Sequence, residues 1–127
     1  MESKKRFDLS GRVAVITGGA GLLGKEHATV IAEAGGVPIM ADVRGEDAQQ
    51  TAQEISEKFQ VPALGVGVDI TNKKEVEQLL EKLIEKFQRV DILINNAAND
   101  PKVGGENQNS DWSRFENFSL EMWEKDL

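Results

Sequence analysis

The chain has 127 residues, of which 39% are hydrophobic and 29% charged, a composition typical of one globular domain large enough to bury a core. Its net charge of −7 argues against a nucleic-acid partner, because phosphate neutralisation needs a basic surface. The absence of cysteine excludes disulfides, and the single histidine, His27, excludes a metal site built from several histidines.

The N-terminal segment does not resemble a targeting signal. Its first six residues are mostly charged, and the mixed stretch 7–11 follows them instead of an apolar core. No apolar run approaches the roughly 20 residues that a membrane-spanning helix needs. We therefore expect a cytoplasmic protein that does not contact a membrane.

Four short apolar runs alternate with amphipathic segments along the chain. The apolar residues of each run are nearly continuous, as in parallel strands that are buried on both faces. Strands that alternate with helices favour a parallel α/β sheet with right-handed crossovers. The doubly wound order of such strands, 3-2-1-4, would place the end of the first strand beside the point where the strand order reverses. The predicted strands are 13–17, 37–41, 63–68 and 91–95.

Three helices are predicted between these strands. The first ends at Gly35-Gly36, since glycine tolerates the positive φ that is common at helix ends. The second has a weak apolar stripe, and the third has a strong one that we expect to cover the sheet. Thr71 or Asn72 caps the third helix, with acidic Glu75 in its first turn. The third helix spans 72–88, and the two stripes are Ala48, Ala52, Ile55 and Phe59, and then Val76, Leu79, Leu80, Leu83, Ile84 and Phe87.

Beyond residue 96 the sequence changes character. Residues 99–118 are polar and contain glycine, which predicts a loop, and Ser119 begins another helical pattern. Three aromatic residues of this region either pin the loop through a local cluster or border a substrate pocket. We treat residues 1–127 as one domain. The three aromatic residues are Trp112, Phe115 and Phe118.

The segment Gly19-Ala20-Gly21-Leu22-Leu23-Gly24 fits the pattern G-x-G-x-x-G between a strand and a helix. Such a turn lets backbone N–H groups and a helix N-terminus face a pyrophosphate. Asp42 ends the next strand eighteen residues after Gly24, where a carboxylate accepts hydrogen bonds from ribose hydroxyls and repels a 2′-phosphate. The motif therefore predicts a Rossmann-type, doubly wound domain that binds NAD(H) in preference to NADP(H).

Plainer interpretations of these residues stay open. The glycines can form an ordinary tight turn, and Asp42 can be a solvated acid at a strand end. Arg44, two residues further on, is either a surface residue or a partner for a 2′-phosphate.

Four segments of the chain carry a combined signature. They are residues 7–12, then Thr17-Gly18-x-x-Gly21-x-x-Gly24, then Val68-Asp69-Ile70-Thr71, and Asp-Ile-Leu-Ile-Asn-Asn-Ala-Ala at 91–98. In this order and spacing they resemble the short-chain dehydrogenase/reductase family, over nearly the whole chain. The resemblance implies the NAD(H)-binding, N-terminal half of an oxidoreductase that moves hydride between a nicotinamide cofactor and an alcohol or ketone.

The resemblance also implies a role for three groups of residues. The first group would line the pyrophosphate through its backbone, the second would hold the adenine edge, and the third would pass close to the adenosine ribose, with Asn95 steadying the central strands. The plainer interpretations are a turn or helix-capping acid for Asp69 and a strand-end turn for Asn95-Asn96. The three groups are Gly18, Gly21, Leu22 and Leu23; Asp69 and Ile70; and Asn96, Ala97 and Ala98.

The chain departs from the family pattern in its motifs and in its catalytic residues. Leu22 stands where compact members have glycine, and Ala98 replaces the last residue of N-N-A-G. The family's chemistry uses a Tyr, a Lys four residues later and a Ser, and this chain contains no tyrosine. We therefore predict no catalytic residue in this chain. Two alternatives to half an enzyme are a non-catalytic NAD(H)-binding module and a truncated, inactive product.

A sheet that ends at its fourth strand leaves an edge and an apolar face of that strand uncovered. Exposed edges and apolar patches promote association. We therefore expect the isolated chain to be marginally stable, and either to self-associate or to be half of a longer protein.

Overall fold

The computed structural model of the chain describes residues 6–97. The predictions made for Ala98, for the loop at 99–118 and for the segment that begins at Ser119 lie outside the described residues. A single domain over residues 1–127 therefore stays a prediction.

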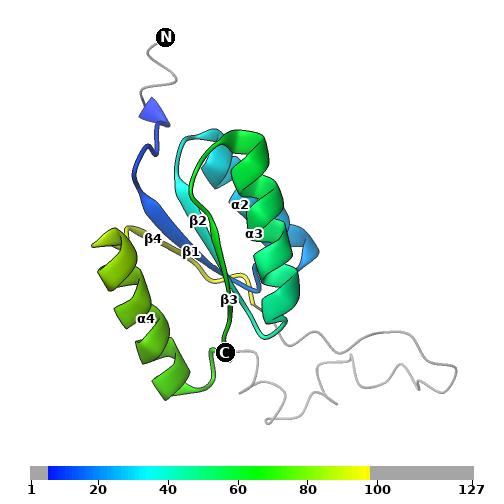
Figure 1. Cartoon of the computed structure of the whole chain (residues 1–127), viewed down its shortest axis with the longest axis vertical. Helices are drawn as coiled ribbons and strands as arrows, with labels where there is room; N and C mark the ends of the chain where they lie inside the picture. The colour runs from blue at the N-terminus through cyan, green and yellow to red at the C-terminus, as the bar shows by residue number, and fades with distance from the viewer. Residues whose placement is uncertain (1–5, 98–127) are drawn as a thin grey trace, which may run out of the picture. The chain divides into compact units, whose positions relative to one another are not determined.

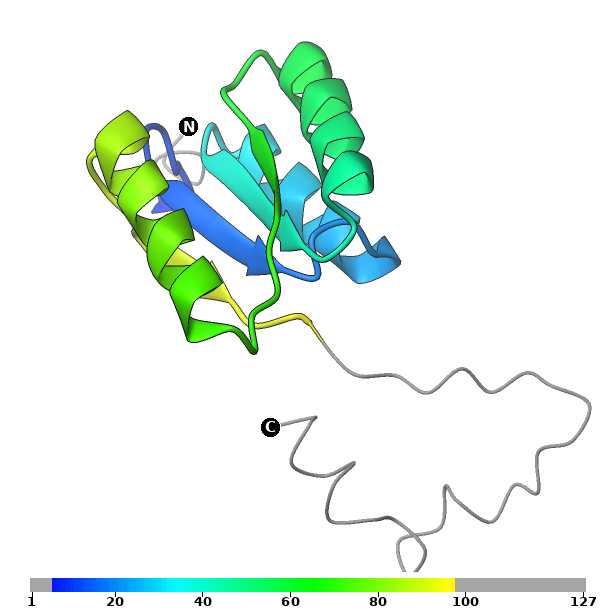
Figure 2. The same cartoon turned by 60° about the horizontal axis from the view of Figure 1, so that its bottom comes forward.

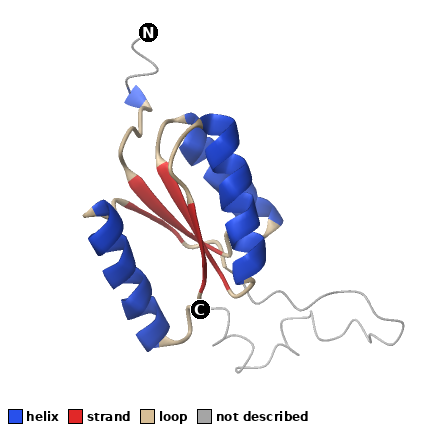
Figure 3. Cartoon of the chain, in the orientation of Figure 1, coloured by secondary structure: helices blue, strands red, loops and turns tan. Residues whose placement is uncertain are grey.

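The four strands of the described residues form one parallel sheet (Figure 3). The strand order β3-β2-β1-β4 confirms the predicted order 3-2-1-4. β1 pairs with β2 from Val13 opposite Val37, and with β4 from Ala14 opposite Ile92. The elements are β1 (Val13–Thr17), α2 (Leu22–Glu33), β2 (Val37–Asp42), α3 (Gly45–Phe59), β3 (Leu64–Gly67), α4 (Lys73–Phe87) and β4 (Ile92–Ile94).

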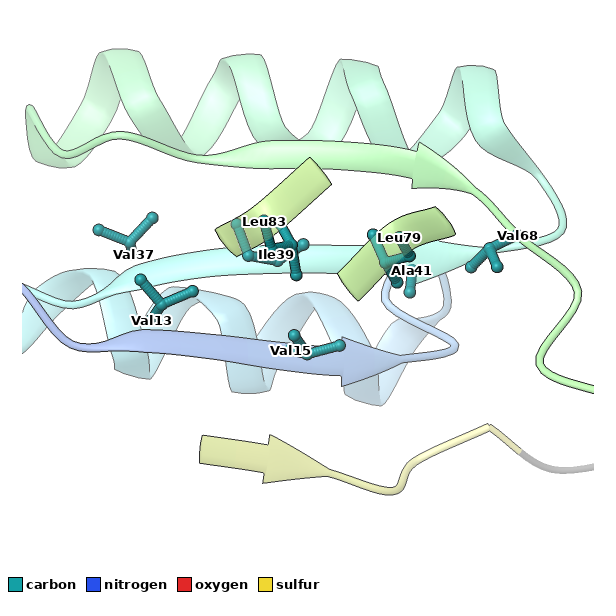
Figure 4. Packing of buried hydrophobic residues seen from close by; sticks show 8 residues of the cluster. All are labelled: Val13, Val15, Val37, Ile39, Ala41, Val68, Leu79 and Leu83. Atoms are coloured by element: carbon teal, nitrogen blue, oxygen red, sulfur yellow. The ribbon is translucent and has the colours of Figure 1, made fainter. Parts of the chain in front are cut away.

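Helices cover both faces of this sheet, with α2 and α3 on one face and α4 on the other (Figures 1 and 2). Because successive residues of a strand point to opposite faces, Ile16 packs with alanines of α2 and α3, whereas Val13 and Val15 pack with Leu79 and Leu83 of α4 (Figure 4). Every residue of β1 and β2 is buried, as nearly continuous apolar strands predict. None of the helices in residues 6–97 is long and apolar enough to cross a membrane.

Local sequence signals determine the helix ends. α2 ends in a Schellman motif, in which Gly35, at φ +88°, and Gly36 donate to carbonyls of the last turn at 3.0 and 2.9 Å. α4 begins after Asn72, whose side chain accepts a hydrogen bond from the Glu75 amide at 3.3 Å. Both observations confirm the predicted helix boundaries.

The prediction that the whole apolar stripe of α4 covers the sheet is wrong. Leu79 and Leu83 are buried, but three other stripe residues are exposed. The physical reason is that six apolar positions span a wider arc of a helix than one sheet contacts. Lys82 lines a groove beside β3, so the exposed part of the stripe lies on the opposite flank of α4. The exposed residues are Val76 (39%), Leu80 (51%) and Ile84 (45%).

β4 also presents an exposed apolar side chain. Leu93 is 60% exposed, and within residues 6–97 β4 pairs with β1 alone. Self-association of the chain rests on surfaces of this kind and stays a prediction.

The outer strands are shorter than the apolar runs that predicted them. β3 covers Leu64–Gly67 instead of 63–68, and β4 covers Ile92–Ile94 instead of 91–95, whereas β2 extends one residue further to Asp42. The predicted runs overshoot because the sequence pattern continues past the last paired residues, which are Leu64 and Gly67 in β3 and Ile92 and Ile94 in β4. The amide of Val68 adds one more hydrogen bond to the β2–β3 pair, to the Asp42 carbonyl at 2.9 Å, just after β3 ends.

Asp91 forms a clamp where β1 and β4 begin. Its carboxylate accepts a hydrogen bond from the Val13 amide at 2.8 Å and bidentate hydrogen bonds from Arg89 at 2.7 and 2.8 Å, with Arg12 at 3.6 Å. The Arg89 hydrogen bonds, and then the Val13 amide, lower the pKa of Asp91 from 3.8 to about 2. The clamp therefore links the start of β1 to the residue that precedes β4.

Replacing Asp91 with asparagine is expected to destabilise the fold and to flatten its acid response. A carboxyl whose folded pKa is depressed stabilises the fold above its unfolded pKa, and this contribution is lost as the pH falls from about 3.8 towards about 2. Urea unfolding between pH 7 and pH 2 checks this. Asp91→Asn should lower the free energy of unfolding at pH 7 and lose less below pH 4, whereas Glu81→Gln, on an exposed helix face, should match the unsubstituted chain. Equal pH profiles for the chain and Asp91→Asn would contradict the clamp.

Candidate functional site

The candidate site lies at the carboxyl ends of β1, β2 and β4. The chain runs outward from β1 through β2 to β3 and then returns to β4 on the other side of β1. The strand order therefore reverses between β1 and β4, which is the position where open α/β sheets bind ligands. The glycine turn follows β1 at this edge, and Asn96 and Ala97 follow β4.

The glycine turn brings α2 very close to the end of β1. Gly18 has φ +65°, and its amide donates to the Ala41 carbonyl at 2.8 Å, while the Gly21 amide donates to the Gly18 carbonyl at 3.1 Å. A Cβ on Gly24 would overlap the carbonyl oxygen of Gly18 and lie 2.7 Å from the Cα of Gly19. Only glycine at position 24 allows this packing of helix against turn.

The N-terminus of α2 faces the site without a side-chain cap. Gly21 is the N-cap residue and has extended backbone, and no acidic residue occupies the first turn of α2. Leu22 and Leu23, the first helical residues, are 82% and 64% exposed. Their backbone N–H groups lie at the positive end of the helix dipole, the usual environment for an anion.

Thr17 connects β1 to the segment after β4. Its buried hydroxyl accepts hydrogen bonds from the amides of Asn96 and Ala97, each at 3.0 Å, and donates to the Ile94 carbonyl at 3.4 Å. The side chain of Asn96 donates to the Gly18 carbonyl at 3.3 Å. A Cβ on Gly18 would lie 3.0 Å from the Cα of Ala97, so the two segments are in close contact.

Asp42 connects the glycine turn to the loop after β2. Its carboxylate is 7% exposed and accepts hydrogen bonds from the Ala20 amide at 3.1 Å and the Arg44 amide at 2.9 Å. The Arg44 guanidinium lies 3.6 Å from the same carboxylate and 3.9 Å from that of Asp47. Asp42 is therefore a fixed negative charge beside the turn, and Arg44 is its neighbour.

Asp69 holds the turn that leads into α4. Its carboxylate accepts hydrogen bonds from the hydroxyl of Thr71 at 2.6 Å and from its amide at 2.9 Å, and these bonds lower the pKa of Asp69 below its ordinary 3.8. This is the plainer of the two interpretations of Asp69. Ile70 is 46% exposed beside it, and a contact of either residue with adenine stays a prediction.

The structure brings Gly18, Asn96 and Ala97 together and places Asp42 beside the glycine turn. Within residues 6–97 the side-chain hydrogen bonds between the ends of β1 and β4 come from Thr17 and Asn96, not from Asn95.

Sequence reasoning missed two residues as candidates. Thr17 is a buried polar residue that ends an otherwise apolar strand, a position where a hydroxyl needs partners. Val43 follows Asp42 and is 73% exposed, an apolar side chain at the same sheet edge as Ile70. The signal for Thr17 was its position directly before a glycine. Nothing in the sequence distinguished Val43 from a further buried strand residue.

Comparisons with known proteins find relatives of this chain. A family model described as short chain dehydrogenase matches residues 12–125. The chain is 43% identical over 90 residues to the short chain dehydrogenase/reductase dpfgG of Gibberella zeae, a match that covers 71% of this chain and 33% of that protein.

Two solved structures are also similar to the chain. An NADPH-dependent 3-quinuclidinone reductase from Rhodotorula rubra is 28% identical with a TM-score of 0.74, covering 97% of this chain and 43% of that one. An NAD+-bound xylitol dehydrogenase is 27% identical with a TM-score of 0.67, covering 71% of this chain and 34% of that one. The chain thus spans less than half the length of these relatives.

Removing the Thr17 hydroxyl is expected to loosen the junction between β1 and β4. Thr17→Val leaves the Ala97 amide without its acceptor and should lower the free energy of unfolding by about 1–2 kcal/mol. Thr17→Ser keeps the hydroxyl and should lose less. Thr29→Val, which removes a hydrogen bond to the Lys25 carbonyl on the exposed side of α2, serves as the matched control in urea unfolding. Equal losses for Thr17→Val and Thr29→Val would contradict this role.

Proposed function

The chain belongs to the short-chain dehydrogenase family, and from this membership we propose that it forms the NAD(H)-binding portion of an oxidoreductase that moves hydride between a nicotinamide cofactor and an alcohol or ketone. One observation carries the proposal. The uncapped N-terminus of α2 packs on a glycine turn, where Gly24 leaves no room for a side chain and Gly18 has a positive φ. That arrangement suits a bound pyrophosphate.

The residues at the site fit a dinucleotide. A Cβ on Gly24 would fill the space between helix and turn, and neither Gly21 nor the exposed first turn of α2 carries a competing acid. Asp42 is buried enough to be held in place, and a carboxylate has more acceptor sites than the two amides use. The site therefore offers backbone donors for phosphates and a carboxylate for ribose hydroxyls.

We assign three regions of the site to three parts of the cofactor. The backbone of the glycine turn and of the first turn of α2 holds the pyrophosphate, the carboxylate after β2 holds the adenosine ribose, and the residues after β3 and β4 border the adenine and the adenosine ribose. Exposed apolar side chains after β2 and β3, on Val43 and Ile70, supply surface against a base. The assigned residues are Gly18, Gly21, Leu22, Leu23, Asp42, Asp69, Ile70, Asn96, Ala97 and Ala98.

The nicotinamide would supply the hydride chemistry when the cofactor is bound, and these residues would hold the pyrophosphate and adenosine parts of the cofactor. The chain contains no tyrosine, so the proton donor that the family uses is not among its residues. A non-catalytic NAD(H)-binding module and an inactive product stay as alternatives to this proposal. Binding, rather than turnover, is therefore the property that tests the proposal.

The proposal extends to location and partners. A cysteine-free chain suits a reducing compartment, and we propose the cytoplasm. The net charge of −7 makes nucleic acid a poor partner, and a small alcohol or ketone would be the substrate of the complete enzyme.

Placing a carboxylate at the N-cap of α2 is expected to abolish dinucleotide binding without destabilising the helix. Gly21 has extended backbone, and a Cβ there would lie 3.3 Å from the Gly18 carbonyl oxygen, so Gly21→Asp needs only a small local shift to cap the helix. Its charge occupies the position of the pyrophosphate. Calorimetric titration with NADH should show at least about a ten-fold loss of affinity, with an unchanged or higher Tm.

Gly21→Asn is the matched control, since it caps the helix with the same shape but no charge. It should bind NADH more tightly than Gly21→Asp. Equal binding by Gly21→Asp and the unsubstituted chain would refute a pyrophosphate site at this helix.

Asp42 is expected to make the site prefer NADH over NADPH. Its carboxylate accepts hydrogen bonds from the ribose hydroxyls and repels a 2′-phosphate, so NADH should raise the Tm more than NADPH does. Asp42→Asn should weaken NADH binding about ten-fold and reduce the difference between the Tm shifts that NADH and NADPH cause. Asp8→Asn is the control. It replaces a carboxylate that accepts a hydrogen bond from the Ser10 amide, and it should leave the Tm shifts with NADH and NADPH unchanged. A larger Tm shift with NADPH than with NADH would contradict the assignment.

A further inference from the structure

Arg44 spans the gap between the loop after β2 and the N-cap of α2. Its Nε lies 3.6 Å from Asp42, its Nη1 lies 3.9 Å from Asp47, and its Nη2 lies 3.9 Å from the point that a Cβ on Gly21 would occupy. The guanidinium therefore lies beside Asp42, which the proposed function assigns to the adenosine ribose, and beside Gly21, which it assigns to the pyrophosphate. A 2′-phosphate bound there would meet this side chain.

The two acids that hold Arg44 differ in how firmly they are placed. The Asp42 side chain is 7% exposed and hydrogen-bonded to two amides, so its position is determined by the fold. The side chains of Asp47 and Arg44 are 58% and 57% exposed, and an ion pair of this kind is weak and easily exchanged. A 2′-phosphate carries up to two negative charges and three acceptor oxygens, whereas a carboxylate carries one charge and two oxygens. A 2′-phosphate thus competes with Asp47 for Arg44, not with Asp42 alone.

We propose that Asp47 is a specificity-determining residue, which engages Arg44 and thereby strengthens the rejection of a 2′-phosphate. The inference rests on the proposed function and adds to it a residue of α3 that the cofactor motif does not include. Asp42 repels the phosphate directly. Asp47 pairs with Arg44, the one cation beside Asp42 in residues 6–97, and so makes it less available to the phosphate. Discrimination between NAD(H) and NADP(H) then depends on the charges of Asp42, Arg44 and Asp47.

The test measures NADH and NADPH affinities by calorimetric titration at low ionic strength, where exposed charges are least screened. Asp47→Asn releases Arg44 and should tighten NADPH binding about three-fold, while NADH binding stays the same. Glu46→Gln is the matched control, because Glu46 lies in the same first turn of α3 and its loss changes the net charge equally. Glu46→Gln should change NADPH affinity less than Asp47→Asn does.

Arg44→Gln separates the specific effect from a general one. It should weaken NADPH binding about ten-fold and NADH binding less, and it should cancel the gain of Asp47→Asn in the double variant, because the two residues act through one pair. The inference is overturned if Asp47→Asn and Glu46→Gln tighten NADPH equally, or if the gain persists without Arg44. If the unsubstituted chain binds neither dinucleotide, the proposed function fails and this inference falls with it.

Discussion

The described fold depends on how closely α2 approaches the end of β1. Gly24 lies so near the Gly18 carbonyl that a methyl group has no room, and the helix therefore begins directly behind the strand. This contact places the N-terminus of α2 at the carboxyl ends of the strands, beside the positions where β2 and β4 end. A looser turn would still allow four parallel strands, but the helix dipole would no longer face the carboxyl ends of β1 and β4.

Polar side chains at the carboxyl ends of the strands also hold neighbouring loops in place. Asp42 is hydrogen-bonded to the amides of Ala20 and Arg44, and Thr17 holds the segment after β4. Each group joins two loops that meet only in the folded chain. A carboxylate or hydroxyl that is already held by the backbone does not have to be ordered when a ligand arrives, which lowers the entropic penalty of binding.

Much of the fold follows from patterns that a reader of the sequence can see, because apolar runs, glycines and caps act locally. The four strands and the ends of α2 and α4 were predictable in this way, whereas the strand order was taken from the doubly wound fold as a whole. The exposure of Leu80 and Ile84 was not, since periodicity shows which side of a helix is apolar and not how much of that side a sheet contacts. The glycine turn and Asp42 were found from spacing, whereas Thr17 required the pairing of residues far apart in the chain. The links from Arg44 to Asp47 and towards Gly21 depend on side-chain conformation, which spacing does not encode.

β4 pairs with β1 over only three residues, yet it is fastened at both ends. Asp91 bonds the Val13 amide before the strand, and the amide of Asn96 bonds Thr17 after it. A slip of one residue along β1 would turn the outward-facing Leu93 to the other face of the sheet, and it would also break both attachments. The register of this short strand is therefore specified by two side-chain hydrogen bonds outside the ladder. Correct alignment of β4 during folding then depends on the side chains of Asp91 and Thr17 more than on the number of paired residues.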